Sequence, residues 1–177
     1  MGHHGVVTND AMRELLKEVR RPLPLLPDRD NQEFLIAEGW TRLGNGAVLL
    51  TALAPRRRTK REFIPGDIQE WEYEVNDVAV WPRIDASVAR EARAVLRLET
   101  GLSLAQPLVQ AGESLPEFTS MRVMVSVSVA VDDQDYEEQP ATLRFFGESP
   151  GMAWMNDLER FEQEAVGIWS FPEFLAI

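Results

Sequence analysis

Few side chains in this chain could act as a nucleophile, a general base or a soft-metal ligand. The 177 residues include no cysteine, and the only histidines, His3 and His4, stand side by side at its beginning. A terminal His-His pair is more typical of a flexible start than of a metal site. Without it no Ser-His-Asp or Cys-His arrangement can be built, and a Ser-Lys pair would need Lys17 or Lys60. We therefore predict no catalytic, cofactor-binding or metal-binding residue.

Carboxylates are the remaining side chains that could do chemistry. Residues 132–138 contain five acids in seven positions, which could hold Ca²⁺ or Mg²⁺. Tyr136 and Glu137 stand where an EF-hand loop needs its turn glycine, so the pattern favours a solvated acidic turn. A second acidic set alternates with apolar residues and is interpreted as the wet face of a strand, namely Glu70, Glu72 and Glu74.

The cations are concentrated in one short segment that could bind a partner. Residues 1–61 carry 11 basic and 7 acidic residues, whereas residues 62–177 carry 7 and 22. The net charge of −11 disfavours nucleic acid, because phosphate neutralisation drives such binding. The segment could be a solvated loop without a partner, and if it binds one we expect a protein, either further copies of this chain or neighbours in an assembly. The predicted contact residues of this segment are Arg56, Arg57, Arg58, Lys60 and Arg61.

The aromatic end of the chain is a second candidate for partner binding. Trp169, Phe171 and Phe174 lie within nine mostly apolar residues at the C-terminus, which could dock onto a neighbour. The alternative, that this segment folds back onto its own domain, is equally compatible with the sequence.

The first half of the chain predicts one helix and several strands. Residues 9–20 form a helix, with Thr8 or Asn9 as its cap and an apolar face. Gly44-Asn45-Gly46 predicts a hairpin between 33–43 and 47–54, although the first arm could begin as a short helix at Asn31. The basic segment 55–61 is an exposed loop, and strict alternation predicts strands over 70–75 and 78–81.

The second half predicts two further helices and a long hairpin. Asp85 caps a helix over 86–99, with Arg90, Arg93 and Arg97 on its exposed side, and residues 101–119 form a loop. Residues 121–131 form the strongest strand, which would aggregate as an open edge, and 142–146 form its partner. Ser149-Pro150 begins a last helix that extends to residue 165.

These elements predict a single α+β domain over residues 1–177. A mainly antiparallel or mixed sheet of about four to six strands carries about three helices. The N-terminal helix 9–20, a core over 33–165 and a tail over 166–177 are its parts. No apolar run approaches the roughly 20 residues of a membrane helix, so we expect a cytoplasmic protein or one assembled into a particle in the cytoplasm.

Two short segments resemble parts of the Nudix family. Arg97-Leu98-Glu99-Thr100-Gly101-Leu102 is similar to the end of the Nudix box, and Trp154-Met155-Asn156-Asp157-Leu158 to the closing region of that fold. The loose match spans residues 80–164. In that family glutamates of the box bind the magnesium that activates pyrophosphate hydrolysis, whereas here Ala94, Val95 and Leu98 replace three box positions. The resemblance implies a degenerate ligand-binding domain or a weak hydrolase.

Scarce catalytic residues and segregated charge favour a non-enzymatic function. We expect a structural or interaction subunit that works through protein-protein contacts in a larger assembly, for example a neck or tail-end protein of a phage-like particle. Opposite charge on the two parts of the chain suits head-to-tail association. The alternatives are an acidic immunity or antitoxin-type protein and the Nudix-like domain.

Overall fold

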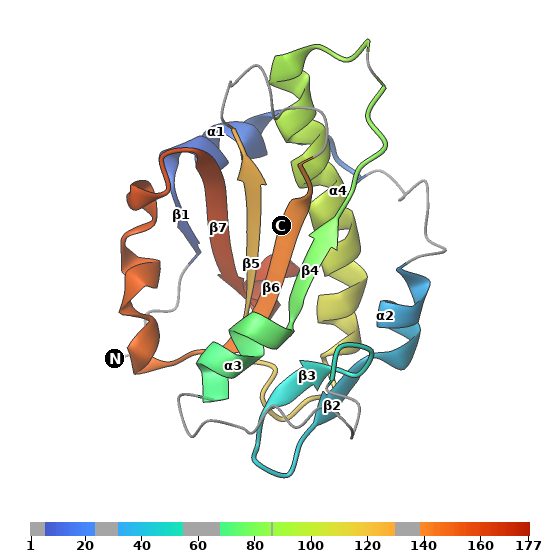
Figure 1. The fold of residues 1–177 in the computed structure, drawn as a ribbon, viewed down its shortest axis with the longest axis vertical. Coiled ribbons are helices and arrows are strands. Elements are labelled where there is room, and N and C mark those ends of the chain that lie inside the picture. Colours follow the sequence, from blue (N-terminus) through green and yellow to red (C-terminus); the bar gives the residue numbers. More distant parts are fainter. Residues whose placement is uncertain (1–5, 24–31, 55–67, 86, 130–138) are drawn as a thin grey trace.

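The computed structural model describes residues 6–23, 32–54, 68–85, 87–129 and 139–177, and Figure 1 shows their arrangement. Five strands form the main sheet in the order β1-β7-β5-β6-β4, and two further strands form a separate hairpin. The strands are β1 (Val7–Thr8), β2 (Trp40–Arg42), β3 (Val48–Leu50), β4 (Asp77–Val80), β5 (Met121–Ser128), β6 (Ala141–Gly147) and β7 (Glu164–Ser170). The helices are α1 (Asp10–Glu18), α2 (Glu33–Glu38), α3 (Ile68–Val75), α4 (Arg90–Ala111), α5 (Phe171–Phe174) and the 3₁₀ turns η1 (Pro150–Asn156) and η2 (Leu158–Arg160).

The predicted α+β class is confirmed. Every strand pair within the described ranges is antiparallel, and the main sheet has five strands, within the expected four to six. The predicted hairpin is present as β2 and β3 around Gly46, whose φ is 92°. Its first arm begins with the short helix α2, which was the alternative left open by the sequence.

Both faces of the main sheet are covered. One face packs against α4 and α1, and Figure 1 shows α4 along the β4 side of the sheet. The opposite face packs against the 3₁₀ turns and Tyr73 of α3. Because β7 and β6 pair with either side of β5, this strand lies at the centre of the sheet and has no open edge. Its pairing with β6 confirms the predicted partner over 142–146.

Residues 70–75 belong to α3, so the predicted strand is wrong. Glu70 and Glu74 are exposed, as expected of a wet face, but Glu72 is only 3% exposed. Its carboxylate accepts hydrogen bonds from the backbone N–H groups of Val48 (2.7 Å) and Gly147 (2.6 Å). These contacts offset the desolvation of a buried charge, and they come from strands distant in sequence. The helix is therefore fixed by tertiary contacts that local alternation does not reveal.

The predicted helix 86–99 and the predicted loop 101–119 are both wrong in their boundaries. The helix α4 begins at Arg90 with Ala89 at its cap and continues to Ala111 through Pro107. The helix continues through Gly101. A glycine is accommodated here because α4 lies close to β6, and an added Cβ would stand 3.0 Å from the Cβ of Ala141. Burial of the leucines beyond Gly101 favours the longer helix. No helix in the described ranges has the length and apolarity needed to cross a membrane.

The C-terminal part also differs from the predicted helix over 149–165. Ser149 does cap a helical turn, as expected, by accepting from the N–H of Gly151 at 3.1 Å. The turn η1 then ends at Asp157, whose φ and ψ of −133° and 66° are not helical, and η2 is a separate short turn. The chain enters β7 at Glu164, so Ala165 belongs to the sheet.

Candidate functional site

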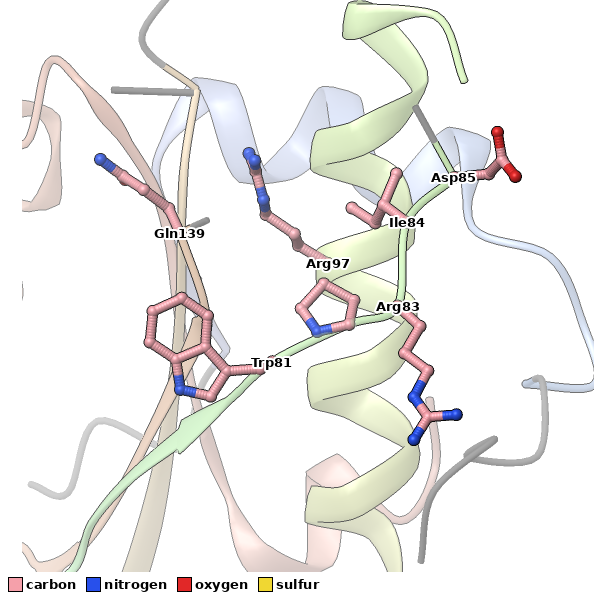
Figure 2. Close-up of a pocket in the computed structure, with 7 residues that line it drawn as sticks. Trp81, Arg83, Ile84, Asp85, Arg97 and Gln139 are labelled. Carbon is pink, nitrogen blue, oxygen red and sulfur yellow. The ribbon is translucent and has the colours of Figure 1, made fainter. Parts of the chain in front are cut away.

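An open cavity of about 620 Å³ lies where β4 ends, and Figure 2 shows its lining. The cavity is formed by three parts of the chain: the stretch that follows β4, one residue of α4 and one residue that precedes β6. We call it the Trp81 cavity. Its described lining residues are Trp81, Pro82, Arg83, Ile84, Asp85, Arg97 and Gln139.

Trp81 is exposed because it continues the alternation of β4. Val78 and Val80 are buried, whereas Asp77 and Ala79 face solvent. Trp81 follows on the solvent side and is 57% exposed, more than any other large hydrophobic residue of the described ranges. Pro82 comes next and has no N–H, so it cannot extend the hydrogen-bonded ladder. The edge strand therefore ends in an exposed indole beside a cavity.

Arg97 of α4 is a charged residue that lines the inner wall of this cavity. It lies on α4 directly before Leu98, and only 2% of it is exposed, so the predicted solvated arginine stripe is wrong at this position. In Figure 2 its side chain runs along α4 on the same side of stretch 81–85 as Trp81 and Gln139. A guanidinium stays charged in proteins and presents five N–H donors. Arg97 therefore places a buried positive charge at the inner wall of the cavity.

The outer part of the cavity carries both signs of charge. Figure 2 shows the exposed side chains of Arg83 and Asp85 on the side of the stretch away from Arg97. Asp85 was expected to cap α4, but its Oδ1 accepts from the N–H of Ser87 at 2.8 Å, within a local turn. Hydrogen bonds from Ser87, first from its side chain, hold the pKa of Asp85 below its usual range. The described lining therefore includes two guanidiniums and one carboxylate.

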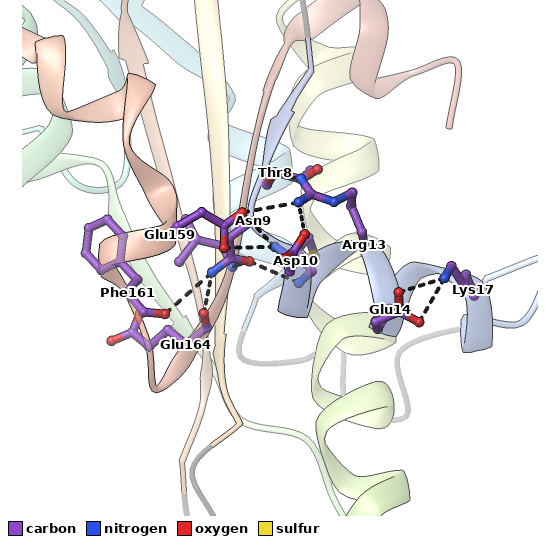
Figure 3. A network of polar contacts seen from close by, with 11 residues as sticks. Thr8, Asn9, Asp10, Arg13, Glu14, Lys17, Glu159, Phe161 and Glu164 are labelled. Carbon is purple, nitrogen blue, oxygen red and sulfur yellow. Dashed lines mark hydrogen bonds and ion pairs between the residues drawn. The ribbon is translucent and has the colours of Figure 1, made fainter.

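A network of polar contacts lies at the opposite edge of the sheet, as Figure 3 shows. Here η2 and the start of β7 lie against the start of α1. The N–H of Asp10 donates to Glu159 at 3.0 Å, and Arg13 pairs with both of these carboxylates. We call this surface the acidic edge. Its carboxylates are Asp10, Asp157, Glu159, Glu162 and Glu164, and its cations are Arg13 and Arg160.

The buried side chain of Asn9 connects the start of α1 to β7 at the acidic edge. It is 2% exposed, and its Oδ1 accepts from the N–H groups of Met12 (3.0 Å) and Val166 (3.0 Å). Its Nδ2 donates to the carbonyl of Glu164 at 2.7 Å (Figure 3). The same side chain thus caps α1, as expected from the sequence, and attaches it to β7.

Glu99 of the suggested Nudix box forms a structural contact between α4 and the segment that follows α1. Glu99 is 1% exposed and accepts from Arg20 through its backbone N–H (2.8 Å), Nε (3.1 Å) and Nη2 (2.8 Å). Hydrogen bonding to the Arg20 side chain holds the pKa of Glu99 below its usual range, despite burial. Gly101 lies against β6, and Trp154 packs edge-on against Tyr73.

Of the predicted partner-binding residues, the structure describes only those at the aromatic end. The basic cluster Arg56, Arg57, Arg58, Lys60 and Arg61 lies outside the described residues, as do His3, His4 and residues 132–138. The aromatic end folds back, which was the open alternative. Trp169 and Phe171 are fully buried, and Phe174 is 3% exposed. In this structure these three side chains therefore belong to the hydrophobic core.

The sequence interpretation missed the Trp81 cavity, although one signal for it was present. The alternation of Val78 and Val80 places Trp81 on the opposite, exposed side of the strand. The position of Arg97 had no comparable signal, because it depends on how α4 lies on the sheet. Among the residues that the structure describes, no three metal-ligating side chains gather into a group.

We compared this chain with protein families, curated proteins and solved structures. No protein-family model matches it, and neither the curated proteins nor the solved structures contain a significant match.

Proposed function

We propose that this chain is a non-enzymatic structural subunit that associates head to tail with further copies of itself. The observation that carries the proposal is the opposite charge of the two sheet edges. The arginine-lined Trp81 cavity follows β4 at one edge, and the acidic edge lies beside β1 at the other. Complementary charge on two different surfaces favours an interface that repeats from one copy to the next.

The distance between the two surfaces supports a head-to-tail contact. Four strand spacings of about 4.8 Å separate β1 from β4, or roughly 19 Å. This exceeds the Debye length of about 8 Å at physiological salt, so the charges of the two surfaces are screened from each other within one chain. Each surface can therefore attract a different neighbouring copy. Contact between two like edges would place arginine opposite arginine, or carboxylate opposite carboxylate. Such pairing is unfavourable, which supports a repeating contact over a two-fold one.

The chemistry of the described polar groups also supports a binding function. Asp85 is the one carboxylate among the described lining residues of the Trp81 cavity, which have no hydroxyl or imidazole group. The buried carboxylates have structural partners: Glu72 binds backbone N–H groups and Glu99 binds Arg20. The kind of assembly, a phage-like particle among others, stays a prediction from the sequence.

Light scattering across a series of protein concentrations, at low and at moderate salt, tests the proposal. We expect a mass above the 20.1 kDa of one chain that rises with concentration and falls when salt is added, because screening weakens contacts between exposed charges. A mass of one chain under all conditions would contradict the proposal. An oligomer that is insensitive to salt would contradict its electrostatic basis.

A further inference from the structure

A second cavity, of about 220 Å³, lies beside the middle of α4. It is lined by residues 21–23, which follow α1, by Leu102 and Gln106 of α4, and by residues 174–177. We call it the Leu102 cavity, and we infer that it binds a small aliphatic monocarboxylate, with the tail inside and the carboxylate at Arg21. None of its lining residues belongs to the Trp81 cavity or the acidic edge, so the inference is independent of the proposed association.

The walls of the Leu102 cavity are mostly apolar. Leu102 is fully buried, and Phe174 is only 3% exposed. Leu23 and Leu175 are partly buried and pack against the same hydrophobic core. Ile177, which also lines the cavity, is 39% exposed. An aliphatic tail in this position would remove apolar surface from water, which is the main favourable contribution to binding in a pocket of this kind.

Arg21 supplies this cavity with a cation that has no partner of its own. Arg20 and Arg21 are consecutive and both exposed, but Arg20 binds Glu99 through its backbone N–H, Nε and Nη2. Among the residues that the structure describes, none forms a hydrogen bond or an ion pair with the side chain of Arg21. Its guanidinium donors are therefore open to a ligand, and a carboxylate can accept from two of them at once.

The charge of the lining favours an anion over a cation. Arg21 is the one charged side chain among the described lining residues, and Gln106, which is exposed, adds an uncharged amide. The chain as a whole has a net charge of −11, which repels anions in general. An anionic ligand would therefore be attracted here by the local cation and not by the overall field of the chain.

The volume of the Leu102 cavity limits the size of the tail. A cavity of about 150 Å³ that is lined by leucine, isoleucine and phenylalanine accommodates a benzene molecule. The Leu102 cavity, at about 220 Å³, is larger than this. Sites for drug-sized ligands begin at about 300 Å³, so nucleotides and large cofactors exceed it. A tail of about six to eight carbon atoms fits this range, and octanoate is therefore the probe.

Titration of the isotope-labelled chain with octanoate, followed by NMR of the backbone amides, tests the inference. We expect saturable shifts at the three segments that line the cavity. Hexanoate has two methylene groups fewer and should bind roughly fifteenfold more weakly, because each buried methylene contributes about fourfold in affinity. Octylammonium has the same tail and the opposite charge, so it should bind about tenfold more weakly than octanoate.

Two variants separate the contribution of the tail from that of the carboxylate. Gln106→Phe places a ring at an exposed lining position and should weaken octanoate binding about tenfold, because the ring competes for the cavity. Gln110→Phe is its matched control, one turn further along α4, exposed and outside the lining. Arg21→Gln should weaken octanoate binding about fivefold and leave binding of 1-octanol unchanged. Arg160→Gln, at an exposed arginine outside the lining, is the control for the lost charge.

Each result either supports this site or overturns it. Saturable shifts that Gln106→Phe removes and Arg21→Gln weakens, with both controls unchanged, would support it. If no saturable shifts occur, or if Gln106→Phe leaves them unchanged, the site is overturned. If octylammonium binds as well as octanoate, or if Arg21→Gln binds octanoate as well as the unaltered chain, the assignment of a carboxylate ligand is overturned. Circular dichroism shows that each variant is folded, and work at a concentration where single chains predominate keeps the result separate from the proposed association.

Discussion

The two edges of the main sheet are completed in different ways. At the β1 edge the strand has only two residues, and a buried side chain, Asn9, continues it by binding the backbone of β7. At the β4 edge the strand ends in Trp81, which is 57% exposed, and then in Pro82. A buried amide secures one edge to its neighbour, and an exposed indole beside an arginine-lined cavity ends the other.

This difference separates side chains that maintain the fold from side chains that are suited to bind a partner. Hydrogen bonds from Asn9 satisfy backbone groups, so their loss leaves buried donors and acceptors without partners. A large exposed side chain contributes little to folding, because its surface is in water in both the folded and the unfolded state. Substitutions near β1 should therefore change stability, and substitutions near Trp81 should change association.

The largest effect on stability is expected for Gly167→Ala, in the strand that pairs with β1. An added Cβ would lie 2.1 Å from Cη2 of Trp169, whose ring is fully buried over this glycine. A buried ring cannot move away without displacing its neighbours, so we expect a loss of at least about 3 kcal/mol in unfolding free energy by urea titration. Gly44→Ala is the control, because nothing lies within 4 Å of its added Cβ, and a change below about 0.5 kcal/mol is expected. Equal effects would contradict the packing argument.

Asn9→Ala should have the next largest effect. The substitution removes the cap of α1 and leaves the N–H of Val166 and the carbonyl of Glu164 without their side-chain partner. We expect a loss of about 3 kcal/mol, measured by urea unfolding. Asn9→Asp keeps the accepting oxygen and loses the donor, so its loss should be smaller. An aspartate variant as unstable as the alanine variant would show that the amide donor matters more than the cap.

Local patterns predicted the elements that are specified by neighbouring residues. Asn9 has the side chain of a helix cap, and the Gly44-Asn45-Gly46 segment can adopt positive φ, so α1 and the β2–β3 hairpin were predicted. In contrast, α3 was mistaken for a strand, because the alternation of its glutamates suggested a wet face. The carboxylate of Glu72 is instead buried by contacts with strands 24 and 75 residues away. No local pattern encodes such contacts.

The candidate site was predictable only in part. Strand periodicity extended from Val80 would have placed Trp81 on the exposed face of the edge strand. Arg97 has the spacing of an exposed helical stripe with Arg93, yet it is buried, because α4 is longer than predicted and lies along the sheet. Whether the aromatic end is buried in its own domain or docks onto a neighbour could not be predicted, because the same apolar residues suit a core or an interface.

Glu99→Gln examines the contact between Arg20, in the segment that follows α1, and Glu99 of α4. Because Arg20 lowers the pKa of Glu99 in the folded chain, the ionised carboxylate stabilises the fold above its unfolded pKa of about 4.3. This stability is lost as the pH falls through the lower folded pKa. We expect the variant to lose about 1–2 kcal/mol at pH 7, and to differ less from the unaltered chain as the pH falls below about 4. Urea unfolding at both pH values measures it, and a difference that is independent of pH would contradict this assignment.

The smallest effect on stability is expected for Trp81→Ala, and this small effect sharpens the contrast between the edges. If the indole serves the fold, its removal should cost as much as the loss of other large aromatic residues, which is about 3–5 kcal/mol when they are buried. If it serves a contact, the unfolding free energy measured at a concentration where single chains predominate should change by less than about 0.5 kcal/mol. Phe34→Ala, at another exposed aromatic residue, provides the matched stability control. A loss of unfolding free energy near 3 kcal/mol for Trp81→Ala, but not for Phe34→Ala, would show that Trp81 stabilises the β4 edge. Both edges would then contain side chains that maintain the fold.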